Sequence, residues 1–160
     1  MKIKGFVEED FIQYKKPSMF IGTCFCDWKC CVEGNFDKKI CQNNSLYDIP
    51  PINISEEEAF ERYINNPITK SIVIGGLEPL LQFDEVLSLI KYFRDNGCND
   101  DFVIYTGYYE NEVKDKIEEM KKYKNIILKF GRYKPNQEKH YDDVLGVYLA
   151  SDNQYAKKIS

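Results

Sequence analysis

The chain is organised around residues 24–31, which read Cys24-Phe25-Cys26-Asp27-Trp28-Lys29-Cys30-Cys31. With Cys41 just downstream, five of the six cysteines fall in one stretch. The apolar run Met19-Phe20-Ile21-Gly22 comes before them and is typical of a buried strand. Because α/β folds bind ligands at the carboxyl ends of their strands, thiols on a loop at this place predict a binding site. Thiolates are soft ligands, which suit soft metals and iron–sulfur clusters.

Three uses of the clustered cysteines are open at this point. A disulfide framework needs an oxidising compartment, and residues 1–5 contain no apolar signal region that would direct secretion. Structural zinc usually takes its four ligands from two paired groups, but elsewhere the sequence offers only Cys98 and His140. An iron–sulfur cluster is the third use, and the motifs further along the chain favour it.

The bulk composition narrows the class of protein. A length of 160 residues with 43% hydrophobic residues predicts one globular domain, 1–160, with one core. The net charge is −4 and there is no basic block, so nucleic acid is disfavoured as a partner. No apolar run approaches the length of a membrane span. Free thiols without a signal region predict a cytoplasmic protein.

Strands and helices alternate beyond the cysteine loop. Strands are expected at 71–74, 102–105 and 125–130, and helices at 55–66, 84–97 and 110–123. Ser55 and Glu58 form a capping box at the first helix. Parallel strands need such helical crossovers. The predicted fold class is therefore α/β: a partial, incomplete TIM-like βα barrel with a mainly parallel curved sheet and outer helices, since the chain is too short for eight βα units.

Glycine ends three of the expected parallel strands. Gly75 and Gly76 follow the first, Gly107 the second and Gly131 the third. Glycine at a strand end lets a ligand approach the backbone closely. Their recurrence at one end of the sheet, together with the cysteine loop, predicts a shared site there.

The order of these motifs resembles the radical S-adenosylmethionine (SAM) enzymes. It is most similar to the small activating proteins of anaerobic ribonucleotide reductase. The resemblance covers most of the chain and is carried by Met19-Phe20-Ile21, Gly75–Pro79, Val103–Tyr108, Ile127–Arg132 and Ser151-Asp152-Asn153-Gln154. It implies a radical SAM-like domain that binds a [4Fe-4S] cluster and SAM as cofactors.

The cysteine spacing departs from that family's C-x3-C-x2-C fingerprint. Cys26 and Cys30 have the first spacing, but Glu33 stands where the third cysteine would be. Cys31 is a poor replacement, because neighbouring side chains diverge in most backbones.

Cys41 is the better replacement for the third ligand. It is followed by Gln42-Asn43, and members of the family commonly have an aromatic residue and Asn after their third cysteine. The resemblance therefore implies cluster ligation by Cys26, Cys30 and Cys41, with an enlarged loop between the last two. The alternatives are Cys24 and Cys31. Three ligands would leave one iron open, where the family binds the amino and carboxylate groups of SAM.

A second departure is Leu77, which is inserted between Gly76 and Glu78. In the family this strand end contacts the amino group of SAM, so Glu78 would take that role only if the turn bulges by one residue. The resemblance implies a SAM site made of Gly75, Gly76, Glu78, Thr106 and Gly107. A third departure is Lys129-Phe130, where the activating proteins tend to have an acidic residue before the glycine.

The implied activity is that of a radical SAM enzyme, an oxidoreductase like the activases of glycyl-radical enzymes. It would cleave SAM reductively to a 5′-deoxyadenosyl radical. The implied partners are a protein substrate, such as a glycyl-radical enzyme, and a small electron-donor protein. No His, Ser or Asp constellation assigns an acid–base catalytic residue. The alternative is a non-catalytic iron–sulfur or zinc protein on the same scaffold, which the altered spacing and Leu77 favour.

Overall fold

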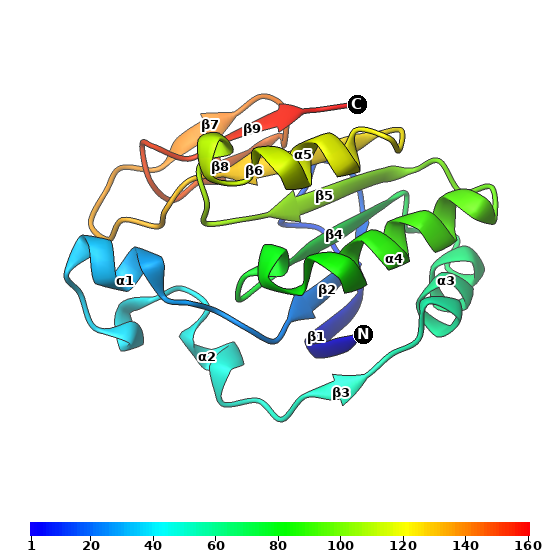
Figure 1. Cartoon of the computed structure of the whole chain (residues 1–160), viewed down its shortest axis with the longest axis horizontal. Coiled ribbons are helices and arrows are strands. Elements are labelled where there is room, and N and C mark those ends of the chain that lie inside the picture. The colour runs from blue at the N-terminus through cyan, green and yellow to red at the C-terminus, as the bar shows by residue number, and fades with distance from the viewer.

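The computed structural model describes all residues, 1–160, and places seven strands in one mixed sheet (Figure 1). In spatial order these are β3 (Ile52–Asn53), β1 (Lys2–Asp10), β2 (Ser18–Thr23), β4 (Ser71–Gly76), β5 (Asp101–Tyr105), β6 (Ile126–Phe130) and β9 (Tyr155–Lys158). A separate hairpin is formed by β7 (His140–Asp142) and β8 (Val147–Leu149).

The sheet is not the mainly parallel one of a TIM-like barrel, so the predicted fold class is wrong. Only the pairs β2–β4, β4–β5 and β5–β6 are parallel, whereas β1–β2, β1–β3 and β6–β9 are antiparallel. The connection between β1 and β2, residues 11–17, is too short for a parallel crossover. Antiparallel strands at both ends therefore flank a parallel centre, and the α/β protein has a mixed sheet.

Helices α3 (Glu56–Asn65), α4 (Phe83–Asp95) and α5 (Lys114–Met120) connect the parallel strands. The Ser55 hydroxyl accepts a hydrogen bond from the Glu58 amide (3.0 Å), which is one half of the predicted capping box; the Glu58 carboxylate instead pairs with Arg62 (2.9 Å). The helix expected at 110–123 is divided into a 3₁₀ turn, η3 (Glu110–Glu112), and α5. The cysteine loop contains three short helical elements, α1 (Lys29–Gly34), η1 (Lys38–Ile40) and α2 (Asn44–Tyr47). A further 3₁₀ turn, η2 (Pro79–Gln82), follows β4. None of the helices combines the length and apolar character needed to cross a membrane.

The two faces of the sheet are covered differently. Alternate side chains of β4, such as Ile72 and Ile74, pack with the helices in the main core. Val73 points to the other face, where a smaller cluster includes Tyr14 and Leu145. The connection of residues 11–17 and the β7–β8 region thus close the face that an open half-barrel would leave free. The carboxyl ends of the parallel strands remain available for a site.

Gly76 lies where β4 and β2 approach each other closely. Its φ is +89°, and a Cβ there would lie 3.0 Å from the Gly22 Cα and from the Thr23 amide nitrogen. Glycine is therefore required by the packing of β4 against β2, independently of any ligand.

Gly76→Ala should lower the free energy of unfolding by about 2–4 kcal/mol, because it adds backbone strain and a clash with β2. Gly97→Ala is the matched control: Gly97 has φ +82°, but nothing lies within 4 Å of its added Cβ. It should lose only the strain, about 1–2 kcal/mol. Urea unfolding measures both. Equal losses in the two variants would contradict a steric role for Gly76.

Candidate cofactor site

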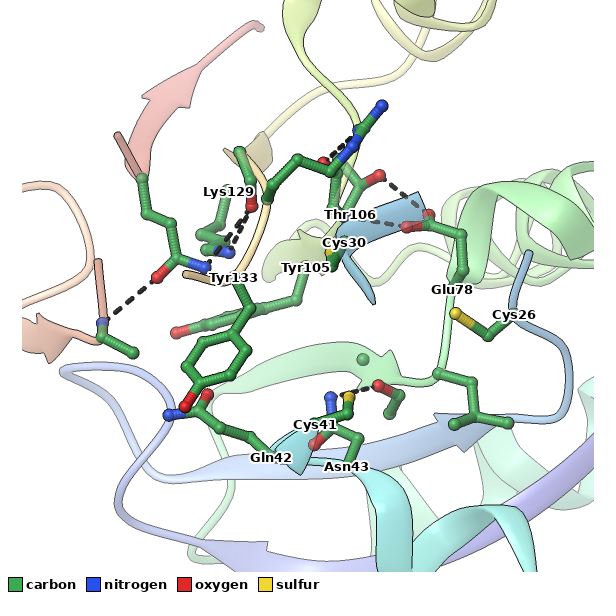
Figure 2. Close-up of a pocket in the computed structure, with 18 of the residues that line it drawn as sticks. Cys26, Cys30, Cys41, Gln42, Asn43, Glu78, Tyr105, Thr106, Lys129 and Tyr133 are labelled. Carbon is green, nitrogen blue, oxygen red and sulfur yellow. Dashed lines mark hydrogen bonds between the residues drawn. The ribbon is translucent and has the colours of Figure 1, made fainter. Parts of the chain in front are cut away.

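The carboxyl ends of β2, β4, β5 and β6 surround a cavity of about 250 Å³ (Figure 2). All eight residues that the sequence analysis assigned to cofactors line it: Cys26, Cys30, Cys41, Gly75, Gly76, Glu78, Thr106 and Gly107. Parallel strands in register end at one edge, which is why residues so far apart in the sequence meet here.

The structure separates the six free cysteines into two groups. Four line the cavity: Cys26, Cys30, Cys31 and Cys41. Cys24 is buried outside it, and its amide donates a hydrogen bond to Gln82 Oε1 (2.6 Å). Cys98 lies beside a different cavity, at the opposite end of the sheet. Of the two alternative ligands, only Cys31 therefore lies with the proposed ones.

The cavity-lining thiols are held by local backbone geometry. Trp28 has a left-handed conformation (φ 59°), and its amide donates a hydrogen bond to Cys26 Sγ (3.3 Å). Helix α1 starts at the next residue and carries Cys30 and Cys31. Burial raises the pKa of Cys26 to about 12 and also raises the pKa of Cys30. A metal that binds Cys26 and Cys30 must therefore displace their thiol protons.

Glu33, at the third position of the family fingerprint, does not line the cavity. Its carboxylate instead forms an ion pair with Arg132 (3.0 Å). Glu33 therefore offers no ligand to the cavity. The segment of Cys41 is fastened to the sheet, because the side chain of Asn43 donates a hydrogen bond to the Gly76 carbonyl (2.5 Å).

The thiols lie along the cavity and do not converge on one point. No three His, Cys, Asp or Glu side chains are grouped tightly enough to hold one metal ion, which a tetrahedral zinc site would require. The thiols line the wall of a cavity instead. In an iron–sulfur cluster each cysteine binds its own iron, so the sulfurs stand farther apart than ligands that share one ion. Cysteine thiols around one cavity are the donors that a [4Fe-4S] cluster takes.

Glu78 is buried (4% exposed) and is not a surface turn residue. One carboxylate oxygen accepts hydrogen bonds from Thr106 Oγ1 (2.8 Å) and the Leu80 amide (3.1 Å), and the other accepts from the Gly107 amide (2.8 Å). Burial raises the pKa of Glu78 to about 7, although these hydrogen bonds act in the opposite direction. Glu78 thus ties the end of β4 to the end of β5 and keeps acceptor capacity toward the cavity.

Leu77 forms a bend directly after β4, whose register with β2 is regular up to Gly76. The amide of Glu78 donates a hydrogen bond to the Phe25 carbonyl (2.7 Å), so the turn is anchored on the cysteine loop. The side chain of Leu77 is buried. The insertion therefore does not prevent Glu78 from reaching the cavity.

Sequence reasoning did not assign Lys129 to the site, but this residue lines the cavity and is buried. Its ammonium donates one hydrogen bond, to the Gly131 carbonyl (3.2 Å), and it has no ion-pair partner. Burial lowers the pKa of Lys129 to about 8. A lysine within an otherwise apolar strand was the available signal, because such a charge is buried only where it has a partner or a function. The cavity therefore contains an ammonium group that can form an ion pair with an anionic ligand.

A family model described as a 4Fe-4S single cluster domain matches residues 17–155. The match covers most of the chain, and the protein belongs to this family of iron–sulfur cluster domains. No curated protein and no solved structure matches the chain. Both the family match and the four cavity-lining thiols support a [4Fe-4S] cluster.

Glu78→Gln should destabilise the protein by about 1–3 kcal/mol, because an amide replaces a carboxylate that accepts three hydrogen bonds in a buried site. The control is Glu119→Gln, which removes a surface ion pair and should change stability by less than about 1 kcal/mol. Thermal and urea unfolding of the metal-free proteins measure the difference. Equal stability of the two variants would show that Glu78 does not hold the strand ends together.

Proposed function

We propose that this protein is a radical SAM enzyme. The observation that carries the proposal is that one cavity is lined both by the cysteine loop and by the ends of β4, β5 and β6. A cluster held by three of the thiols would therefore have polar strand ends beside it. When bound, the reduced cluster would supply one electron to SAM, whose S–C5′ bond breaks to give methionine and a 5′-deoxyadenosyl radical.

Cys26, Cys30 and Cys41 would hold the cluster. Glu78 offers a carboxylate oxygen to an amino group, and its position is set by the bonds from Thr106 and Gly107. The backbone carbonyls of Gly75 and Gly76 each already accept one hydrogen bond. Gly75 O accepts from Thr23 Oγ1 (3.0 Å) and Gly76 O from Asn43, so an amino group would use their second lone pairs.

Lys129 supports the presence of an anionic ligand in the cavity. A buried ammonium without an ion-pair partner is costly, and a carboxylate or the cluster itself would offset that cost. Tyr105 is also placed to bound the ligand, since it lines the cavity and its hydroxyl donates to the Gln13 carbonyl. These side chains would bind and orient the ligand and exclude water from it. None of them is assigned as an acid or base.

We further propose that the target is a protein, such as a glycyl-radical enzyme, with a small protein as electron donor. Apolar side chains at the cavity support a macromolecular target: Ile12 and Tyr148 line it and are 73% and 68% exposed. A segment of a partner that enters the cavity would cover them.

A second candidate is a non-catalytic iron–sulfur protein. The observation that favours it is the fourth cavity-lining thiol, Cys31, because four thiolates would occupy all four irons and leave no open site. Ligation and SAM cleavage therefore need separate tests.

Cys26→Ala, Cys30→Ala and Cys41→Ala should each abolish the visible absorption of the reconstituted [4Fe-4S] cluster, because each removes a required thiolate. Cys24→Ala and Cys98→Ala are matched controls outside the cavity and should keep a full complement of iron. Iron and sulfide analysis with electron paramagnetic resonance measures the outcome. Retention of the cluster in Cys41→Ala with its loss in Cys31→Ala would assign the third ligand to Cys31.

Anaerobic wild-type protein given SAM and dithionite should release 5′-deoxyadenosine, and addition of SAM should alter the resonance spectrum of the reduced cluster. Cys30→Ala should release none. Chromatography quantifies the product. A fully loaded cluster that yields no 5′-deoxyadenosine, with a spectrum indifferent to SAM, would support the non-catalytic alternative.

A further inference from the structure

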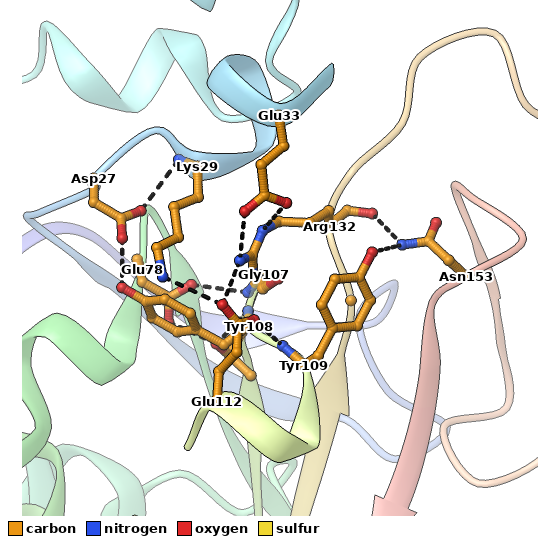
Figure 3. A network of polar contacts seen from close by, with 12 residues as sticks. Asp27, Lys29, Glu33, Glu78, Gly107, Tyr108, Tyr109, Glu112, Arg132 and Asn153 are labelled. Atoms are coloured by element: carbon orange, nitrogen blue, oxygen red, sulfur yellow. Dashed lines mark hydrogen bonds and ion pairs between the residues drawn. The ribbon is translucent and has the colours of Figure 1, made fainter. Parts of the chain in front are cut away.

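Arg132 follows β6 and lies where three loops meet (Figure 3). Its guanidinium is only 4% exposed. It donates two hydrogen bonds to the carboxylate of Glu33 (3.0 and 3.1 Å), one to Glu112 (2.7 Å) and one to the Gly107 carbonyl (2.5 Å). One side chain thus joins helix α1, the loop after β5 and the end of β6.

Two other residues of the cysteine loop reach the same place (Figure 3). Lys29 forms an ion pair with Glu112 (3.2 Å) and lies over the ring of Tyr108, 4.7 Å from its centroid. Asp27 accepts a hydrogen bond from the Tyr108 hydroxyl (2.6 Å). The loop is therefore held on both sides of Cys30. We name this set of residues the Arg132 clasp: Asp27, Lys29, Glu33, Tyr108, Glu112 and Arg132.

The charges in the centre of the clasp balance, with two cations, Arg132 and Lys29, against Glu33 and Glu112. Glu112 is well paired: burial acts to raise its pKa, but hydrogen bonds from Arg132, the Tyr109 amide and Lys29 lower that pKa to about 2. A buried ion pair contributes little net stability, because desolvation offsets its attraction, but it specifies geometry. The clasp is thus better suited to orienting the loop than to stabilising the fold.

Beyond Glu33 the cysteine loop is attached by weaker contacts until Asn43: Phe36 packs edge-on against Tyr133, and Lys38 lies over the ring of Trp28, 4.9 Å from its centroid. Residues 37–40 are exposed, and the ion pairs of the chain do not include them. The loop is accordingly divided into a clasped part that carries Cys26, Cys30 and Cys31 and an exposed part that leads to Cys41.

We propose that Arg132 is a positioning residue for the cluster: through Glu33 and Glu112 it holds residues 27–33 in place before metal binds. Ligand loops without such support usually become ordered only when the metal arrives. Here the clasped thiols already line the cavity, and Cys41 reaches it from the part of the loop that the clasp does not hold. This inference rests on the family's cluster and not on SAM cleavage.

The test uses Trp28, the only tryptophan of the chain, which is 7% exposed and precedes helix α1. In the metal-free full chain, Glu33→Gln and Arg132→Gln should each increase acrylamide quenching of its fluorescence several-fold. The rate of cluster assembly from iron and sulfide should fall about fivefold, as expected for the loss of one modest interaction. Arg132→Lys keeps the charge without the paired hydrogen bonds and should restore only part of the rate.

Arg94→Gln is the matched control, since this half-buried guanidinium bonds only to backbone carbonyls at the other end of the sheet, among them that of Lys124 (2.7 Å). It should lower the melting temperature but leave Trp28 quenching and the assembly rate unchanged. Glu33 is 52% exposed, so Glu33→Gln remains folded even if Arg132→Gln does not. Unchanged quenching and assembly in Glu33→Gln would overturn the proposal, as would an equal effect of Arg94→Gln. Because quenching is measured without cluster or SAM, a failed cleavage assay does not affect this result.

Discussion

The parallel alignment of β2, β4, β5 and β6 is the constraint on which the rest of the structure depends. Ile74 of β4 pairs with Ile104 of β5, which pairs with Leu128 of β6, so the strands end at the same level. The cysteine loop, the glycine turn after β4 and the loop after β5 must therefore leave the sheet together. A site assembled from distant parts of the chain follows from that register.

Bringing these loops together also concentrates polar groups in a place that excludes water. Each buried group has to find partners, because an unpaired one costs several kcal/mol. Glu78 obtains three donors from the loop after β5 and from η2, and Arg132 obtains two carboxylates and a carbonyl. Lys129 obtains only one carbonyl and is the exception. The hydrogen-bonded side chains of Glu78 and Arg132 hold the loops in position. Lys129 marks the place where a ligand would bring negative charge.

Local sequence patterns were sufficient for the elements but not for their arrangement. The runs at 71–74 and 102–105 are strands, and Ser55 caps α3, because apolar periodicity and capping act over a few residues. The barrel prediction failed because β1 and β9 pair antiparallel at the two sides of the sheet. Strand direction at an edge depends on contacts between distant segments, which short-range periodicity does not encode.

The sequence by itself singled out the residues proposed for the chemistry: the clustered cysteines, the glycines after the strands, and Glu78 near the first of them. Residue type and proximity to a strand end are local properties, so they can be read from one stretch at a time. Only the tertiary structure decided which thiols share the cavity, that Cys24 lies outside it, and that Glu33 pairs with Arg132. Those outcomes depend on where side chains point after residues about a hundred positions apart are packed together, and burial and charge pairing act across that distance only in the folded chain.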